Sequence, residues 1–265
     1  MPESELLRDR ERLATAVQEA GAIAKKFFRN PLKHWTKGLG DSPVSEADIA
    51  SNDLLQKRLV EPGDGWLSEE SENDPTRLAA RRVWVVDPID GTRAFIAGRE
   101  DWSVSVALVV DGRPVLAALF APATEELFLS TVGGGATRNG VAIRASAGDS
   151  LDGVRVGGPK RMMERIALKA AGIVPMPRVR SLALRLARVA DGELDAAIAG
   201  GNSHDWDLAA ADLLVHEAGG LMTALDGRVL TYNRPDPMHS IVLATGHNRH
   251  AALADLIRAQ TSEPV

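Results

Sequence analysis

The sequence predicts an α/β protein in which helices and sheets are stacked in α+β layers and whose two halves differ in style. In the first half, three apolar segments follow one another closely, and Asp111-Gly112 between two of them is typical of a tight hairpin turn. Asn139-Gly140 predicts a second turn of this kind. In the second half, helical and strand-like segments alternate, as in helices packed on a sheet. The predicted antiparallel strands are Ser103–Val110, Pro114–Ala121 and Glu126–Thr131.

The N-terminal region predicts two amphipathic helices separated by a polar loop. From Ser4 to Phe28 apolar residues recur at steps of three, four and seven, and Asn30-Pro31 ends this helix. The segment from Lys37 to Pro43 is rich in glycine and polar residues and predicts a mobile loop. Ser45, followed three residues later by Asp48, predicts the start of the second helix. The buried face of this helix is expected to contain Ile49, Leu54, Leu55 and Leu59.

A change of style near residue 150 predicts a domain boundary. We expect residues 1–150 to form an N-terminal α+β domain with the antiparallel sheet, and residues 151–265 to form a C-terminal α/β domain. The helices predicted in the second part are Lys160–Ala171, Ser181–Ala190 and Asp207–Ala218. The strands predicted there are Asp195–Ala199, Leu221–Leu225 and Ile241–Ala244.

The composition is ordinary for a globular protein and excludes several kinds of site. Of the 265 residues, 45% are hydrophobic and 25% are charged. None is cysteine, which excludes disulfides and cysteine nucleophiles and leaves oxygen and imidazole ligands for a metal. A net charge of -5 argues against a surface for nucleic acid polymers, which depends on clustered Lys and Arg. The acidic N-terminus is unlike a signal peptide and no apolar stretch could span a membrane, so we expect a cytoplasmic protein without a membrane partner.

Three acidic residues are expected to lie together around one buried strand. Val83 to Val86 form a short, β-branched run that predicts a strand with Asp87 at its carboxyl end, where open α/β sheets bind ligands. Pro88 is expected to end the strand ladder, because it has no backbone N–H. The turn brings the carboxylates of Asp87 and Asp90 together with a backbone carbonyl, and Glu69 lies upstream. Such oxygens repel one another unless a hard cation neutralises them, so the motif predicts a Mg²⁺ site.

A phosphate site is expected beside these acids. Gly91 and Thr92 open a short helix that continues through Phe95 and Ile96. A helix N-terminus offers free N–H groups and partial positive charge, so it can bind a phosphate next to metal ions. The alternative for any single aspartate is a solvated charge at a strand end. That alternative is weaker for two aspartates that bracket one tight turn.

A second acidic segment runs from Ser203 to Ala211 and carries Asp205 and Asp207 at a predicted helix start. The simplest interpretation is helix capping, in which one of these carboxylates accepts the first backbone N–H groups. Capping is compatible with metal binding, because a carboxylate at a helix start is held rigidly. The six histidines form no spaced ligand set, and we interpret them as surface or satisfied residues. His204 is expected to line the pocket.

Four motifs occur in order along the chain, and their joint pattern is more specific than any one of them. They are Leu67-Ser68-Glu69-Glu70-Ser71, the run Trp84-Val85-Val86-Asp87-Pro88-Ile89-Asp90-Gly91-Thr92, Trp206-Asp207 and Glu217-Ala218-Gly219-Gly220. From about Pro43 to the last predicted strand, the chain resembles the inositol monophosphatase superfamily, whose members are lithium-sensitive, Mg²⁺-dependent phosphatases. The resemblance implies a two-domain αβαβα sandwich of the inositol monophosphatase and fructose bisphosphatase type.

The resemblance also implies a site for two to three Mg²⁺ ions. Glu69, Asp87 and the carbonyl of Ile89 would hold one ion. Asp87, Asp90 and Asp207 would hold a second, and a third, weaker ion would use Glu69 and water.

Catalytic roles follow from the same resemblance. Thr92 would hydrogen-bond the attacking water and Asp48 would take its proton through the Thr92 hydroxyl, although a capping-box acid is the alternative for Asp48. Glu69 would be a third catalytic residue through its role as a metal ligand. The N–H groups of Gly91 and Thr92 would bind the phosphate, and Asp207 would face the substrate. Because paired divalent ions stabilise charge on the phosphate and on the leaving oxygen, we expect direct attack by metal-activated water without a phosphoenzyme, with the leaving group protonated by water on the Asp207 side.

Two departures from the family pattern bear on the substrate. Gly91 to Phe95 read Gly-Thr-Arg-Ala-Phe instead of the Gly-Thr-Thr-Asn-Phe of inositol enzymes, and a basic residue there is similar to 3'(2'),5'-bisphosphate nucleotidases. Gly200 stands where the inositol enzymes place a Glu that binds ring hydroxyls. We therefore expect 3'-phosphoadenosine 5'-phosphate as the substrate. Arg93 would then serve a second phosphate or, as an equal alternative, lie exposed on its helix. Inositol monophosphate is the next alternative, followed by the substrates of histidinol phosphatases and fructose bisphosphatases.

Alternatives from other classes are a non-catalytic metal- or phosphate-binding regulator and a structural Ca²⁺ site. Such a protein would be free to lose a ligand or Thr92, yet all of these residues are present, which favours an enzyme. The expected partner is a small phosphorylated metabolite, and the resemblance allows a homodimer that no residue pattern specifies. The loop from Lys37 to Ser42 is expected to close over the substrate and bring Lys37 towards it.

Overall fold

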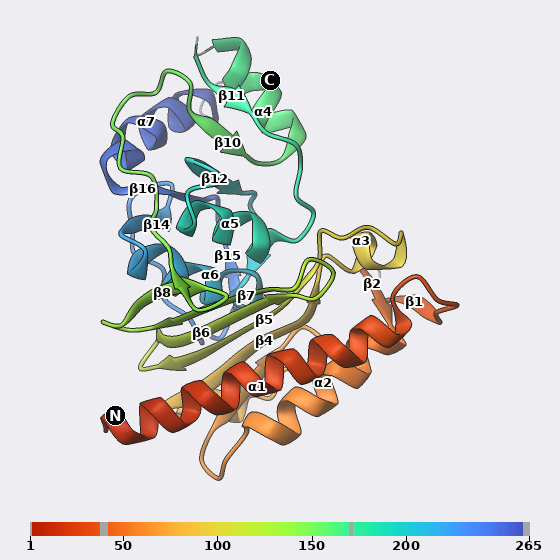
Figure 1. Cartoon of the computed structure of the whole chain (residues 1–265). Helices are drawn as coiled ribbons and strands as arrows, with labels where there is room; N and C mark the ends of the chain where they lie inside the picture. Colours follow the sequence, from red (N-terminus) through yellow and green to blue (C-terminus); the bar gives the residue numbers. More distant parts are fainter. Residues whose placement is uncertain (1, 38–41, 170–171, 262–265) are drawn as a thin grey trace.

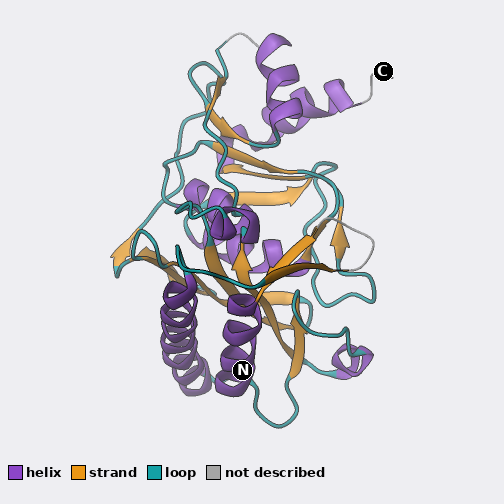
Figure 2. Cartoon of the chain, turned by 90° about the vertical axis from the view of Figure 1, so that its right-hand side faces the viewer, coloured by secondary structure: helices purple, strands orange, loops and turns teal. Residues whose placement is uncertain are grey.

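Five layers, in the order helices, sheet, helices, sheet and helices, make up the fold (Figure 1). The computed structural model describes residues 2–37, 42–169 and 172–261. The paired helices of the three helical layers are α1 (Glu3–Phe27) with α2 (Glu46–Leu59), α5 (Leu182–Ala190) with α6 (Asp205–Glu217), and α4 (Lys160–Lys169) with α7 (His250–Thr261). A view from the side shows the same stacking, with α1 and α2 side by side below the sheet (Figure 2). The predicted αβαβα sandwich is therefore confirmed.

A seven-stranded sheet forms the second layer. Its strands, in spatial order, are β3 (Gly65–Ser68), β4 (Arg82–Asp90), β5 (Ser103–Val110), β6 (Arg113–Ala121), β7 (Glu126–Thr131), β8 (Gly135–Arg138) and β9 (Val141–Ala142). β3 and β4 are parallel, and each later pair is antiparallel. Asp111 and Gly112 connect β5 to β6 with φ angles of 49° and 78°, as a type I′ hairpin turn requires. The predicted antiparallel meander is confirmed.

Strand β4 is buried on both faces, which explains its continuous apolar sequence. Val83 and Val85 face α5 and α6, whereas Trp84 and Val86 face α1 and α2. Helices on both sides therefore hold the strand rigidly just before its acidic end.

The end of β4 differs from the prediction that Pro88 stops the ladder. The strand continues to Asp90, and its pairing with β5 shifts register between Asp87 and Asp90. Such an irregularity tolerates a proline, because a residue there does not donate to the ladder. The prediction was wrong in this point, and the shift is what turns the two aspartates toward one site.

A five-stranded sheet forms the fourth layer. In spatial order its strands are β11 (Val174–Pro175), β10 (Arg155–Gly157), β12 (Ala196–Ala199), β16 (Val242–Gly246) and β14 (Gly220–Ala224). On its outer face, Val156 and Ile198 pack with residues of α4 and α7 such as Met163 and Leu253. The predicted helix Lys160–Ala171 is present as far as Lys169, and its last two positions lie outside the described residues.

Two short ladders complete the described structure. β1 (His34–Lys37) pairs with β2 (Ser42–Ser45), and β13 (Ser203–His204) pairs with β15 (Met238–His239). The predicted loop from Lys37 to Pro43 thus includes strand residues at both ends, and its centre, residues 38–41, lies outside the described residues. In the described part of the chain, no helix is long and apolar enough to cross a membrane.

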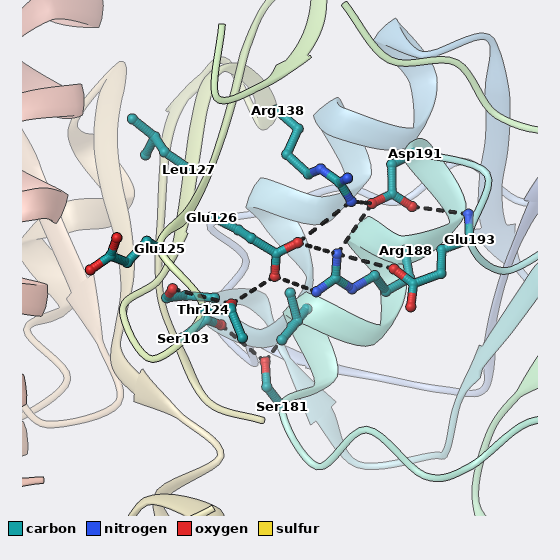
Figure 3. Close-up of polar contacts among 12 residues, drawn as sticks. Ser103, Thr124, Glu125, Glu126, Leu127, Arg138, Ser181, Arg188, Asp191 and Glu193 are labelled. Atoms are coloured by element: carbon teal, nitrogen blue, oxygen red, sulfur yellow. Dashed lines mark hydrogen bonds and ion pairs between the residues drawn. The ribbon is translucent and has the colours of Figure 1, made fainter. Parts of the chain in front are cut away.

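The two halves of the chain share one apolar core. Val85 and Ala107 from the first half pack in the same cluster as Leu186 and Leu208 from the second. A polar cluster of Glu126, Arg188 and Asp191 also joins the two halves (Figure 3). In it, Glu126 of β7 accepts a hydrogen bond of 2.7 Å from Arg188 Nη1 of α5. The boundary near residue 150 stays a prediction.

Arg188 is the centre of this polar cluster, and its removal is expected to destabilise the protein. Its guanidinium also contacts Asp191, at 3.3 Å, and only 11% of its side chain is exposed. Arg188→Met should leave Glu126 and Asp191 without their buried cation and lower the free energy of unfolding by about 1–3 kcal/mol. Urea unfolding measures this. The matched variant Arg228→Met removes an exposed arginine paired with Asp226, and should change the free energy by less than about 0.5 kcal/mol.

Candidate active site

The Asp87 to Asp90 segment is fixed by the burial of the residue between them. The Ile89 side chain is fully buried with Phe95 and Trp102, whose rings meet edge to face at 4.8 Å. The Ile89 N–H donates to Asp87 Oδ1 at 3.0 Å. The apolar side chain thus anchors the turn while the backbone and both carboxylates remain on its polar side.

Gly91 allows the chain to turn from β4 into α3 (Thr92–Ile96). Its φ of 93° lies in the left-handed region, and an added Cβ would come 3.1 Å from Asp101 O and 3.2 Å from Ser181 N. Only glycine fits both constraints. The first N–H groups of α3, next to Asp90, have no partner within the helix.

Asp90 is held by a helix of the other half of the chain. Its Oδ2 accepts hydrogen bonds from Ser181 Oγ at 2.5 Å and from Ala183 N at 2.6 Å, at the start of α5. Ser103 and Ser181 hydroxyls lie 3.0 Å apart (Figure 3). Since the Ser181 proton is directed to Asp90, Ser103 donates to Ser181. Both of the hydrogen bonds that hold Asp90 from the start of α5 therefore use Oδ2.

Asp207 lies in the first turn of α6. Its Oδ2 accepts the His204 N–H at 2.6 Å, so it belongs to the helix cap as predicted. The alternative that Asp205 caps the helix is wrong, because Asp205 accepts from Asn233 N at 2.7 Å and contacts His239 Nε2 at 2.7 Å. His204 is stacked on Trp206, with ring centroids 4.6 Å apart.

Three carboxylates from distant segments meet at one point. Oxygens of Asp87, Asp90 and Asp207 lie within 4.8 Å of one another, and the first two residues are buried. Burial raises the pKa of Asp87 well above its usual range, and the charges of Glu69 and Asp90 raise it further. Burial and then the charge of Asp90 do the same to the pKa of Asp207. A hard divalent cation relieves both costs, and an all-oxygen donor set is the kind that Mg²⁺ prefers.

Glu69 lies beside this triad, and it is not among the three carboxylates that meet within 4.8 Å. The parallel pairing of β3 and β4 places it there, because its N–H continues the ladder to Val86 O at 3.2 Å. Burial raises its pKa, and Lys37 opposes this. Lys37 Nζ donates to Glu69 O at 2.9 Å and forms an ion pair with Glu70. Lys37 thus reaches the edge of the site, whereas closure of its loop stays a prediction.

Thr92 and Asp48 are in contact, as expected. The Thr92 hydroxyl lies 3.3 Å from Asp48 Oδ1 and 3.1 Å from Ile89 O, so its single proton is shared between two acceptors. Asp48 Oδ2 also accepts the Ser45 N–H at 2.8 Å in the capping box of α2. Both interpretations of Asp48 are therefore compatible, because Oδ1 contacts the Thr92 hydroxyl whereas Oδ2 caps the helix. Burial raises the pKa of Asp48, and its bonds to Ser45 and Thr92 oppose the rise.

Two residues near the site were missed in the sequence. Ser181 was expected only as a helix start, yet it binds Asp90. Arg185 is 5% exposed, and burial lowers its pKa to about 10, although the charges of nearby Asp90 and Asp207 oppose this. An arginine four residues before the buried Val189, on the apolar face of a predicted helix, was the available signal.

Arg93 and Gly200, the other residues predicted to bear on the substrate, stay predictions in that role. Arg93 is exposed on α3, and Gly200 lies between β12 and β13 with Pro159 Cγ 3.6 Å from the position of an added Cβ. The histidines with described partners are satisfied, as expected: His216 contacts Asp212, and His250 contacts Thr223.

Comparisons with known proteins agree with this geometry. The sequence model of the inositol monophosphatase family matches residues 8–262. A 3'-phosphoadenosine 5'-phosphate phosphatase of Mycobacterium leprae is 39% identical over 217 residues, which cover 76% of this chain and 75% of that protein. An inositol-1-monophosphatase of Rhizobium meliloti is 33% identical over an alignment of 272 positions, and the alignment covers 96% of both chains.

The fold agrees as well. The crystal structure of the extragenic suppressor protein suhB from Bartonella henselae superimposes with a TM-score of 0.81 at 28% identity, covering 96% of this chain and 98% of that one. Three independent observations therefore coincide: the layered fold, the carboxylate triad and the match along nearly the whole sequence. The chain belongs to the inositol monophosphatase family and is a metal-dependent phosphoric monoester hydrolase.

Proposed function

We propose that the chain hydrolyses 3'-phosphoadenosine 5'-phosphate, acting as a Mg²⁺-dependent 3'(2'),5'-bisphosphate nucleotidase. The carboxylate triad carries the phosphatase part of this proposal, because three acids within 4.8 Å need a divalent cation. Arg93, Gly200 and the similarity to a 3'-phosphoadenosine 5'-phosphate phosphatase support the substrate. Inositol monophosphate is the second candidate, supported by the similarity to an inositol-1-monophosphatase along the whole chain.

The residues that would hold two to three Mg²⁺ ions are the triad together with Glu69 and the carbonyl of Ile89. When bound, Mg²⁺ lowers the pKa of a coordinated water and neutralises charge on the phosphate and the leaving oxygen. The chain supplies the orientation: Asp90 is fixed by Ser181, and Asp207 by the His204 N–H.

The remaining roles concern protons and phosphate oxygens. Thr92 orients the attacking water through its hydroxyl and passes a proton to Asp48, whose Oδ1 lies 3.3 Å away. The N–H groups of Gly91 and Thr92 are directed to the phosphate, as first N–H groups of a helix can be. Arg93, one residue further, is proposed to contact substrate phosphate. A homodimer stays a prediction.

Phosphate release from a small panel of esters tests the substrate. With Mg²⁺, kcat/KM should be at least about tenfold higher for 3'-phosphoadenosine 5'-phosphate than for inositol 1-phosphate or histidinol phosphate, which corresponds to about 1.4 kcal/mol of selective binding. Chelation of Mg²⁺ should abolish release, and Li⁺ should inhibit it. A preference for inositol 1-phosphate would replace the first candidate by the second. No release from any of the three esters would contradict both candidate substrates.

A further inference from the structure

Asp205 is a buried carboxylate at the first position of α6, two residues before Asp207. It belongs neither to the helix cap nor to the carboxylate triad. Its Oδ2 accepts the Asn233 N–H at 2.7 Å, and its Oδ1 contacts His239 Nε2 at 2.7 Å. Because a carboxylate only accepts, we assign the His239 proton to Nε2. Both oxygens of Asp205 therefore bind one part of the chain, residues 230–239, which is named the 230–239 segment below.

The 230–239 segment is also bound to the start of α6 through the backbone. The Asp205 N–H donates to Pro237 O at 3.0 Å. In the ladder of β13 with β15, His204 pairs with Met238. The His204 N–H is in turn the donor that fixes Asp207 Oδ2, at 2.6 Å. The segment thus holds the residues that lead directly into Asp207.

The same segment is bound to the first half of the chain by a buried arginine. Arg77 belongs to the short 3-10 helix η1 (Pro75–Ala79), which follows β3 along the chain. Its Nη1 donates to Asn233 Oδ1 at 2.6 Å, and its Nη2 donates to Arg234 O at 3.1 Å. Asn233 Nδ2 returns a hydrogen bond to Arg77 O at 3.1 Å. Arg77 and Asn233 are therefore joined through both side chains and the backbone.

η1 packs directly on the strand that places Glu69. A Cβ added at Gly65, the first residue of β3, would lie 3.1 Å from Arg77 Cβ. Burial lowers the pKa of Arg77, and the charge of Asp205 opposes this, so the cation and the carboxylate interact across Asn233. A continuous path of contacts therefore runs from β3 through Arg77, Asn233 and Asp205 to the start of α6.

We propose that Arg77, Asp205 and His239 are positioning residues of the metal centre. Through the 230–239 segment they set where Asp207 lies relative to Glu69, which comes from the other half of the chain. Metal ligands must be held to within about 0.5 Å, and buried polar networks behind them provide this, because no member can move without losing its partners. The proposal rests on the proposed function through its metal centre and is independent of the choice of substrate.

Mg²⁺ titrations in the absence of substrate test the proposal. His239→Phe keeps a ring beside Tyr232 and removes the donor to Asp205, so it should raise the Kd for Mg²⁺ in calorimetry about tenfold. His239→Gln, whose amide can still donate, should restore most of the affinity. Arg77→Met, which removes the bonds to Asn233, should weaken Mg²⁺ binding by a similar factor.

Tyr232→Phe is the matched control. Tyr232 belongs to the same segment, and its hydroxyl donates to the buried Oδ2 of Asp212 at 3.0 Å, farther along α6. Loss of this bond should lower the urea midpoint of unfolding, as His239→Phe does, yet leave the Kd for Mg²⁺ unchanged. A merely structural role of His239 would make the two variants alike, whereas a positioning role separates them.

Phosphate release gives a second measurement of the same effect. In His239→Phe the Mg²⁺ concentration for half-maximal rate should rise by the same factor as the Kd. The kcat at saturating Mg²⁺ should stay within about twofold of the parent value, because excess ion compensates for weaker binding.

Three results would overturn the proposal: unchanged Mg²⁺ affinity in both His239→Phe and Arg77→Met, an equal loss of affinity in Tyr232→Phe, or a loss in His239→Phe that His239→Gln does not reverse. If His239→Phe fails to fold, Arg77→Met and Tyr232→Phe decide by the same comparison. Failure of the proposed function gives a different result, namely a parent that binds Mg²⁺ and does not release phosphate from the nucleotide, and the titrations then still decide. A parent that binds no Mg²⁺ would overturn both.

Discussion

The Asp90→Asn variant is expected to lose at least about 100-fold in kcat, whereas its fold stays intact. A neutral amide cannot supply the charge that a divalent cation needs, and the transition-state stabilisation lost with the cation amounts to several kcal/mol, at tenfold per 1.36 kcal/mol. The amide oxygen can still accept from Ser181 and Ala183, which hold Asp90 in the structure. Initial rates of phosphate release at saturating substrate, together with circular dichroism, measure both effects.

Two further variants make this prediction specific. Asp111→Asn makes the same chemical change in the exposed turn between β5 and β6, where a φ of 49° suits asparagine, and should retain full activity. Asp207→Asn should behave like Asp90→Asn, because its amide can still accept the His204 N–H.

Mg²⁺ should raise the unfolding temperature of the parent, because an ion that binds only the folded state stabilises it, and should raise it less in both site variants. Near-normal activity in both site variants would contradict the proposed metal site.

Parts of the fold that depend on neighbouring residues could be predicted from the sequence. The turn at Asp111-Gly112 and the capping box of Ser45 and Asp48 are set by residues within four positions, and both predictions were confirmed. The acidic motif was found for the same reason, since Asp87 to Thr92 carry two carboxylates and a hydroxyl in one short segment.

Contacts between distant segments could not be predicted in this way. Glu69 was expected near Asp87, but not the parallel pairing of β3 with β4 that places it there. The contact of Ser181, at the start of α5, with Asp90 joins residues 91 positions apart and was not expected at all. No local pattern encodes the strand pairing or the contact between Ser181 and Asp90. The continuation of β4 past Pro88 is similar, because the irregular pairing depends on β5.

Polar segments were a further source of error. Lys37 at the end of β1 and Ser42 and Pro43 at the start of β2 belong to a polar, glycine-rich segment, so a loop was expected there. The two strands form a ladder because each supplies the other's backbone partners, which side-chain patterns do not reveal. Arg185 shows the opposite case, in which a charge is buried because the neighbouring carboxylates at Asp90 and Asp207 favour it.

Replacement of Thr92 by Val is expected to lower kcat about 100-fold and to change KM by less than about threefold. The hydroxyl is lost while the shape of the side chain is kept, so the proposed proton path from water to Asp48 would be interrupted, whereas the proposed backbone contacts with the phosphate would remain. Thr92→Ser, which keeps the hydroxyl, should retain most of the activity. Rates at several substrate concentrations separate kcat from KM.

The Asp48→Asn variant then distinguishes the two interpretations of Asp48. If the carboxylate only caps α2, the variant should lose stability and keep its kcat. The effects of Asp48→Asn and Thr92→Val on kcat and on the free energy of unfolding should then be additive in the double variant. If it takes the proton from Thr92, kcat should fall about as far as in Thr92→Val. The double variant should then be no slower than either single variant, because two residues that act as one unit cannot be lost twice. Additive losses in kcat would separate Asp48 from Thr92 and leave the proton path without its acceptor.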